Sequence, residues 1–253
     1  PSVTTIFLSA TSTKVSLYIF IRFLFTIYGV DYAFNELAIT EILLPLGLLG
    51  IFVATVVAMF QTDLKRLLAY SSIAQIGYIV VGLSLSTVSG LTASITHIFN
   101  HGLIKAALFM AVGMIVLRMK TSDLQDLSGV GKQMPLTSFG FVLGGLGIIG
   151  VPLTAGFVSK WLLLIATFEQ GWWTTAILLL FSSLLSIVYV WRFVEVAYFK
   201  PVQDGAEKIS EGPLSMHLSM WLLLGLMVYF GLQTEFSVAI AQQAALNLLG
   251  GQL

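Results

Sequence analysis

Residues 42–60 read ILLPLGLLGIFVATVVAMF, a run of 19 residues without a charged side chain. An apolar helix of about 20 residues is long enough to cross the hydrocarbon core of a bilayer. The whole chain has this character, since 57% of its 253 residues are hydrophobic and only 9% are charged. Soluble domains carry roughly 25% charged residues. The composition therefore predicts a membrane protein that crosses the bilayer as helices, which satisfy their own backbone groups in lipid.

Similar apolar runs recur along the chain, separated by short polar connections. We expect an all-α polytopic membrane protein with about seven transmembrane helices. Their expected ranges are 3–30, 42–60, 67–85, 91–117, 138–168, 173–197 and 214–232. The residues after 232 are then expected to form a tail outside the membrane.

The fifth of these ranges is too long for a single span. Its 31 residues would reach about 46 Å as one continuous helix, whereas the hydrocarbon core is about 30 Å thick. In its middle, the stretch GIIGVPLTAGFVSK (147–160) contains Gly150, Pro152 and Gly156, which favour an interruption. We therefore expect one discontinuous helix, whose freed backbone groups must face protein or a water-filled cavity.

The charges of the connections predict the orientation in the membrane. With these spans, every basic residue in the connections or near the adjoining helix ends falls on one side: Lys65, Arg66, Arg118, Lys120, Lys132, Arg192, Lys200 and Lys208. The positive-inside rule makes that side the cytoplasm. We expect a multi-pass protein of the cell's inner (cytoplasmic) membrane, with Glu36 and the C-terminus external.

Several classes of function find no support in the residues. The formal net charge is zero, so no basic surface suggests a nucleic-acid partner. The chain has no cysteine, which excludes a disulfide framework and a thiolate metal site. Phosphate-binding glycine loops, H-E-x-x-H and nucleophile motifs are not found in the sequence. We expect neither a cofactor nor a metal.

The helix that contains THIFNHGLIKAALF (96–109) carries His97, His101 and Lys105 at intervals of four residues. Such residues form a polar stripe along one side of a helix. Ionisable groups in a membrane are costly and usually mark relays or face water, and histidine titrates near neutral pH. We interpret the stripe as a proton relay. The alternatives are hydrogen bonds that tie helices together, or a metal bound by the two histidines.

Three further basic residues lie inside expected spans. Lys14 sits near the middle of the first helix, where the alternative to a proton site is a salt bridge to a carboxylate on another helix. Arg22 lies nearer the outer end, and we interpret it as structural, with its side chain snorkelling to water. Lys160 follows the interruption of the fifth helix, beside Ser159 and close to Thr154. Its place next to freed backbone groups makes it the strongest single candidate for a functional residue. The alternative is a side chain that snorkels to water from a helix end.

A second polar stretch surrounds the connection between the second and third spans. Asp63, Lys65 and Arg66 are typical of a cytoplasmic helix junction. The next helix carries polar side chains that would bind water or a neighbouring helix, namely Ser71, Ser72, Gln75 and Tyr78.

These motifs together resemble the antiporter-like, proton-conducting membrane subunits that Mrp-type cation/proton antiporters, respiratory complex I and membrane-bound hydrogenases share. Three stretches resemble signatures of that family's second half, in its order and spacing: QTDLKRLLAYSSIAQIGY (61–78), HIFNHGLIKAALF (97–109) and GVPLTAGFVSKWLLL (150–164). TSTKVSLYIFIRF (11–23) resembles the lysine helix before them. The resemblance covers essentially the whole chain.

The resemblance implies roles for the basic residues. Lys14 would be the central lysine that closes the first half-channel, His101 and Lys105 the connecting relay, and Lys160 the terminal residue. His97 fits the same stripe. The family has two inverted repeats of five helices, each with one interrupted helix. Residues 42–199 would be the second repeat, 1–30 would end an incomplete first repeat, and 200–253 would add a cytoplasmic loop, a final helix and the external tail.

The resemblance also implies a function and partners. The family's first repeat carries a glutamate and a lysine on helices that are not present before Pro1, so we expect a heteromeric complex with other membrane subunits. The lysine in GFVSK, where one complex I subunit has glutamate, favours the D-type subunit of an Mrp antiporter, which moves protons in exchange for a cation such as Na⁺. The alternatives are a proton-pumping subunit of a redox-driven complex, in which case the assembly would be a translocating enzyme, and a membrane scaffold without transport.

Overall fold

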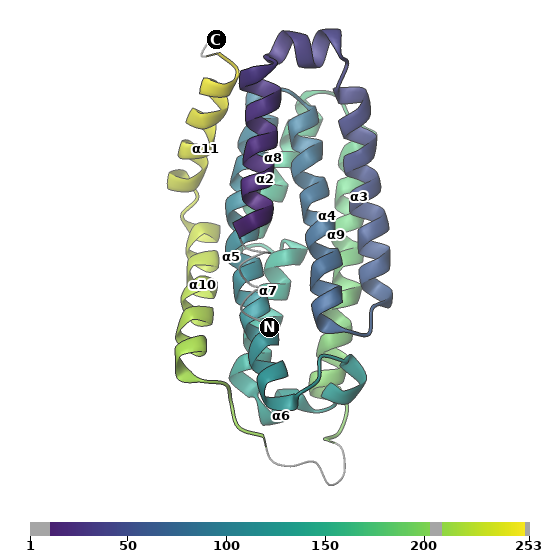
Figure 1. Ribbon diagram of the computed structural model, residues 1–253, viewed down its shortest axis with the longest axis vertical. Helices are drawn as coiled ribbons and strands as arrows, with labels where there is room; N and C mark the ends of the chain where they lie inside the picture. Colours follow the sequence, from purple (N-terminus) through teal and green to yellow (C-terminus); the bar gives the residue numbers. More distant parts are fainter. Residues whose placement is uncertain (1–10, 203–208, 251–253) are drawn as a thin grey trace.

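The computed structural model describes residues 11–202 and 209–250, and these residues form helices without β-strands. The helices run roughly parallel to the long axis of the molecule (Figure 1). In chain order the α-helices are α2 (Thr13–Arg22), α3 (Thr40–Phe60), α4 (Leu64–Ser84), α5 (Val88–Met119), α6 (Val130–Gln133), α7 (Pro135–Ile149), α8 (Ala155–Glu169), α9 (Trp173–Val194), α10 (Leu214–Leu232) and α11 (Glu235–Leu248). Short π or 3₁₀ turns are η2 (Phe23–Ile27), η3 (Asp31–Glu36), η4 (Leu124–Leu127) and η5 (Glu195–Phe199).

Five helices of the described chain are long and apolar enough to cross a membrane. They are Thr40–Phe60, Leu64–Ser84, Val88–Met119, Trp173–Phe199 and Leu214–Leu232, and they confirm five of the expected spans. The first expected span begins within residues 1–10, which lie outside the described residues, and α2 and η2 form its remainder. Helix α5 is longer than expected, because Thr87 caps it by accepting a hydrogen bond from the backbone N–H of Gly90 at 3.1 Å.

The interruption expected in the fifth span is confirmed. Helix α7 ends at Ile149, Gly150 takes a left-handed conformation with φ of 86°, and α8 begins at Ala155. Thr154 caps the second half, since its hydroxyl accepts a hydrogen bond from the N–H of Phe157 at 3.3 Å. The side chain of Asn100 on α5 donates to the carbonyl of Ala155 at 2.7 Å. The break therefore faces the polar side of α5 rather than lipid.

A second interruption lies where the sequence suggested only an external tail. The residues after Leu232 form α11, which continues the direction of α10 beyond a short break and packs against α5 (Figure 1). The expected tail is therefore a helix of the bundle. The two breaks meet, because Gly231 lies against the backbone of Leu153 so closely that a Cβ would not fit.

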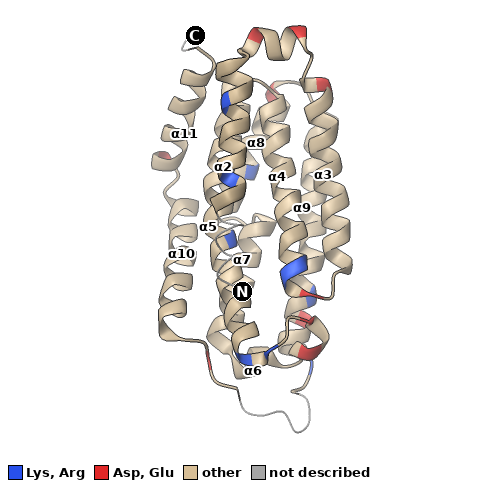
Figure 2. Ribbon diagram, viewed as in Figure 1, with Lys and Arg blue, Asp and Glu red and all other residues tan. Residues whose placement is uncertain are grey.

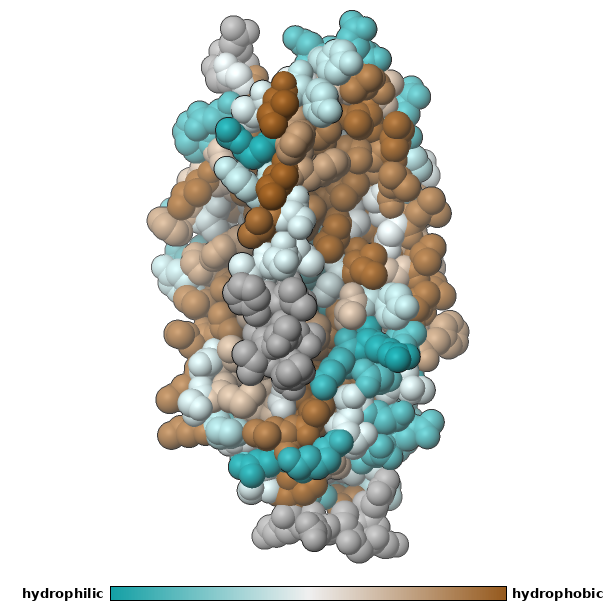
Figure 3. All heavy atoms as spheres, in the orientation of Figure 1, coloured by the Kyte–Doolittle hydropathy of each residue, from teal (hydrophilic) through white to brown (hydrophobic). Residues whose placement is uncertain are grey.

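Helix α5 is the centre of the bundle and packs against α4, α7, α8, α10 and α11. Helices α3 and α4 approach closely, because Gly47 and Gly77 leave no side chain between their backbones. Hydrophobic side chains cover most of the face shown in Figure 3, and hydrophilic ones gather toward its two ends. This surface fits a bundle whose sides contact lipid or other apolar helices.

Acidic residues mark one end of the bundle, at η3 and the start of α3, while the other end carries both signs of charge (Figure 2). Lys and Arg residues also occur along the middle of the bundle, away from either end. Helix α11 runs toward the end of the bundle that carries η3 (Figure 1). Glu36, which is expected to be external, and the end of α11 therefore lie at the same end.

Candidate functional site

The stripe on α5 begins with Lys105, which is fully buried between α5 and α4. Its Nζ donates to the carbonyl oxygen of Leu68 at 2.7 Å and to Ser71 Oγ at 2.5 Å. The hydroxyl of Ser71 also contacts the Leu68 carbonyl, at 3.0 Å. The expected polar residues of α4 thus supply oxygen acceptors for the lysine ammonium.

One turn along α5, His101 is buried with an exposed fraction of 1%. Among residues 11–202 and 209–250, neither of its ring nitrogens has a hydrogen-bond partner. Its ring stacks on that of His97, with centroids 6.1 Å apart and planes only 4° from parallel. Buried ring nitrogens are normally hydrogen-bonded. Both ring nitrogens of His101 are therefore available to bond water and to exchange a proton with it.

His97 connects the stripe to the interrupted helix. Its Nδ1 lies 2.8 Å from Ser159 Oγ on α8, and its Nε2 lies 3.1 Å from Gln75 Oε1 on α4. Its ring is also 5.9 Å from that of Tyr78. Because an imidazole that accepts at one nitrogen donates at the other, these two contacts hold His97 in a fixed orientation between three helices.

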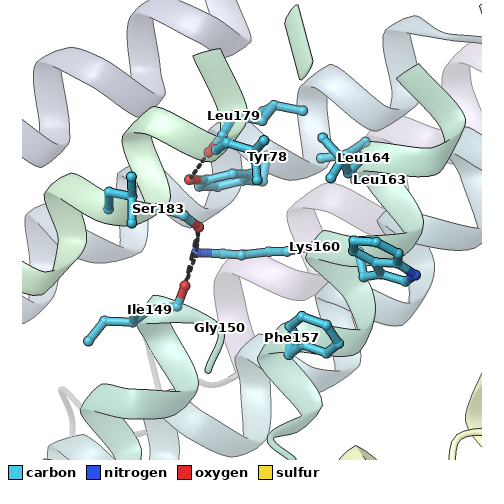
Figure 4. Close-up of a pocket in the computed structure, with 12 residues that line it drawn as sticks. Tyr78, Ile149, Gly150, Phe157, Lys160, Leu163, Leu164, Leu179 and Ser183 are labelled. Carbon is cyan, nitrogen blue, oxygen red and sulfur yellow. Dashed lines mark hydrogen bonds between the residues drawn. The ribbon is translucent and has the colours of Figure 1, made fainter. Parts of the chain in front are cut away.

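Lys160 lies immediately after Ser159 and points into the break (Figure 4). Its Nζ donates to the carbonyl oxygens of Ile148 and Ile149 at 2.8 and 3.1 Å and to Ser183 Oγ at 2.9 Å. The two carbonyls belong to the last turn of α7, which has no further helix residues to bond them. The partially negative end of α7 favours a cation at this position.

A cavity of about 340 Å³ adjoins this ammonium. Tyr78 forms one wall, with its ring centroid 4.6 Å from Lys160 Nζ, and its hydroxyl contacts Ser182 and the carbonyl of Leu179. The opposite walls are apolar and include Trp161 and Leu184, which are half exposed or more. The Lys160 side chain therefore lies between freed carbonyls and a cavity that opens on the side of α8 and α9.

Four of the five candidate residues come together in one row, which is buried at Lys105, His101 and His97 and half-buried at Lys160. In spatial order it runs from Lys105 through His101 and His97 to Lys160, with Ser71 and Ser159 as hydroxyl contacts. Lys14 lies on α2, half buried, and its Nζ contacts Thr13 Oγ1 at 3.3 Å. Its role in a relay was implied by the resemblance and stays a proposal.

Sequence reasoning missed two polar contacts of the row, Ser183 and Asn100. Serines are common in membrane helices, and nothing in LLLFSSLLSIV (178–188) distinguishes the serine that meets Lys160. Asn100 was recognisable from the sequence, because an amide in an apolar helix needs a hydrogen-bond partner. In the structure its side chain bonds the carbonyl of Ala155 at the break. Within the described chain, no group of three His, Asp or Glu side chains is placed to hold a metal ion.

The sequence and the fold match known proteins. The model of the family described as "NADH:quinone oxidoreductase/Mrp antiporter, TM" matches residues 1–186. The chain is 38% identical to NADH-quinone oxidoreductase subunit N of Desulforudis audaxviator, over 95% of this chain and 50% of that protein. It is 33% identical to F(420)H(2) dehydrogenase subunit N of Methanosarcina mazei, over 77% of this chain and 41% of that protein. The chain thus spans about half the length of these relatives.

Solved structures share the fold. A chain of the membrane-bound sulfane sulfur reductase, an archaeal respiratory membrane complex, has a TM-score of 0.87 and 30% identity, with 98% of this chain and 50% of that chain covered. A chain of the Mrp complex from Dietzia sp. DQ12-45-1b has a TM-score of 0.86 and 22% identity, with coverage of 98% and 53%. At that identity the second likeness shows the fold alone.

Proposed function

Because the chain belongs to the family of membrane subunits found in NADH:quinone oxidoreductases and Mrp antiporters, we propose that it translocates protons through its buried row of lysines and histidines. The observation that carries this proposal is the alignment of these side chains in one row. Lys105, His101 and His97 follow one face of α5, and Ser159 joins His97 to the turn of α8 that bears Lys160.

The row has the chemistry that proton transfer needs. Histidine both accepts and donates a proton near neutral pH, and a buried lysine exchanges its proton far more readily than an exposed one. Each lysine ammonium is held by neutral oxygens rather than by a carboxylate, so its proton can leave without breaking an ion pair. Water bonded to His101 would bridge the remaining gap between His101 and Lys105.

Lys160 is the proposed point of exchange with the external side. Its half-helix α8 leads to Glu169, which accepts a hydrogen bond from Ser89 Oγ at 2.5 Å at the outer start of α5. Lys14 would receive or deliver protons at the other side of the row, by analogy with the central lysine of the family. The structure of residues 11–202 and 209–250 supports this order by the sequence of contacts, with Lys105 at one end of the row and Lys160 at the other.

We further propose which kind of complex drives the transport. The most similar relatives named above come from redox enzymes, at 38% and 33% identity, and they support membership of a redox-driven complex. An Mrp-type antiporter that exchanges protons for Na⁺ is the second candidate, favoured by the lysine in GFVSK. Copurifying subunits distinguish them: iron–sulfur or quinone-reactive partners support the redox complex, and small membrane subunits without cofactors support the antiporter.

Proton flux in vesicles that carry the intact complex tests the relay. We expect His101→Leu to lose flux while the complex still assembles, because leucine fills a similar volume but has no proton acceptor. Phe109→Leu is the matched control on the same helix, buried but outside the row. Flux in the His101→Leu variant equal to that of the control would show that protons cross by another route.

A further inference from the structure

The break between α10 and α11 lies level with the centre of α4, a helix long enough to cross a membrane. His97 contacts Gln75 and Ser94 Oγ donates to the carbonyl of Ile79, which fixes how α5 lies against α4. In this alignment Phe99 is level with the centre of α4, a helix of 21 residues or roughly 31 Å. Phe99 packs edge-on against Phe230, with centroids 5.0 Å apart. Phe230 therefore lies level with the centre of α4, which is long enough to cross a hydrocarbon core about 30 Å thick.

The backbone of this break is only partly covered by the described chain, because Gly231 contacts Leu153 while Gln233 and Glu235 are exposed. Thr234 precedes α11, but its side chain forms no capping hydrogen bond within the residues described. The first N–H groups of α11 therefore have no helical partner. Lipid cannot satisfy such groups, and irregular backbone at this depth occurs only against protein or water.

The outward face of α11 is polar at the same depth. This face carries four exposed residues. They are Glu235 and, four, seven and eight positions after it, Ala239, Gln242 and Gln243. Glu235 lies about one turn beyond Phe230. A carboxylate on the lipid face of a helix is costly, and such groups usually pair with another group. A polar stripe with one small residue is typical of a helix–helix contact in membranes.

A groove of about 260 Å³ runs beside this stripe, between α5 and α11. Its walls are apolar, with Phe99, Phe230, Phe236 and Ile240 among them. Thr96 also borders it, and the Thr96 hydroxyl is buried without a hydrogen-bond partner among the described residues. The groove thus offers room for apolar side chains and one unused polar group.

We propose that the outer face of α11, together with this groove, binds a transmembrane helix of another subunit that presents a lysine or arginine to Glu235. Such a helix covers the freed N–H groups, fills the groove with apolar side chains and pairs with the carboxylate. The partner helix is expected to present a lysine or arginine, because a carboxylate inside a membrane is retained when a cation pairs with it. The inference concerns assembly and does not depend on the proposed proton relay.

A photo-crosslinking residue at position 239, in the intact complex in native membranes, tests this docking face. We expect adducts with a membrane helix of a different subunit that carries a lysine or arginine within about one helical turn of the crosslink. Adducts only with lipid, only with a second copy of this chain or with another segment of the same chain would overturn the proposal.

Charge reversal gives a second test of the same contact. We expect Glu235→Lys to reduce the amount of this subunit retained in the purified complex by roughly tenfold or more, as for a broken charge pair. Replacement of the crosslinked lysine or arginine of the partner helix by glutamate should restore retention of the Glu235→Lys subunit. The control is Glu36→Lys, the same change at an exposed carboxylate in η3. Equal retention of Glu235→Lys and Glu36→Lys would overturn the pairing.

Discussion

The hydroxyl of Ser159 lies 2.8 Å from Nδ1 of His97, so the residue before Lys160 is hydrogen-bonded directly to the histidine stripe of α5. This contact joins two helices whose motifs are separate features in the sequence. The interruption of the α7–α8 span makes it possible, since the capped start of α8 brings Ser159 and Lys160 beside α5 and α9 respectively.

We predict that Ser159→Ala slows proton flux without loss of the complex. The change removes one hydrogen bond of His97, which costs about 1 kcal/mol, and frees the ring to leave its position between α4 and α8. Flux and subunit abundance are measured together in vesicles. Ser186→Ala is the control, because Ser186 is equally buried and bonds the carbonyl of Ser182 on its own helix. Unchanged flux in Ser159→Ala would show that the contact only holds the helices together.

We predict that Lys105→Met abolishes flux and leaves the subunit assembled. Methionine fills the space of the lysine stem, and the Leu68 carbonyl keeps its contacts with the hydroxyls of Ser71 and Ser72. Replacement of a buried charge by an apolar side chain of similar volume is often neutral for stability. The measurement is proton flux with thermal stability of the purified complex in parallel. Normal flux in this variant would remove Lys105 from the relay.

A pH-dependent effect on stability is expected at Asp63, which caps α4. Burial raises the pKa of its carboxyl, but hydrogen bonds from Ser122 Oγ and from the N–H of Arg66 outweigh it, so the pKa lies below its usual value of 3.8. The carboxylate therefore stabilises the fold above about pH 4, and this contribution is lost as the pH falls through the lowered pKa.

The Asp63→Asn variant checks this assignment. We expect a lower melting temperature than wild type at pH 7, and a difference that shrinks as the pH falls below about 4. Asp31→Asn, at an exposed carboxyl in η3, is the control. A constant difference between Asp63→Asn and wild type across this pH range would show that the carboxylate charge is not responsible.

Orientation in the membrane is testable because the 253 residues contain no cysteine. We predict that an impermeant maleimide labels Glu36→Cys in intact cells, and labels Lys120→Cys only after the membrane is opened. Both positions lie in connections between helices, at residues that are exposed. The opposite pattern of labelling would invert the orientation predicted from the basic connections.

The sequence predicted the first interruption but not the second, for a physical reason. Gly150 and Pro152 disfavour a continuous helix by themselves, whereas LQTEF (232–236) contains only a short polar interval. Such an interval is equally typical of the end of a span. Only the packing of α11 on α5 shows that the helix continues.

The candidate site was predictable to a similar extent. The four-residue spacing places His97, His101 and Lys105 on one side of α5 by helix geometry alone. The contact with Lys160 depends on how α8 folds back against α5, which no local pattern specifies. Ser183 and its bond to Lys160 belong to the same class of long-range contact.

Lys160 offers the most direct measurement of the proton relay. We predict that Lys160→Ala and Lys160→Arg both abolish proton flux in vesicles that carry the intact complex, with subunit abundance at the wild-type level. Alanine removes the proton carrier and keeps helix propensity, while arginine keeps the charge but does not release its proton. Wild-type flux in the Lys160→Arg variant would contradict the account, because Lys160 would then be a fixed charge between Ile149 and Ser183.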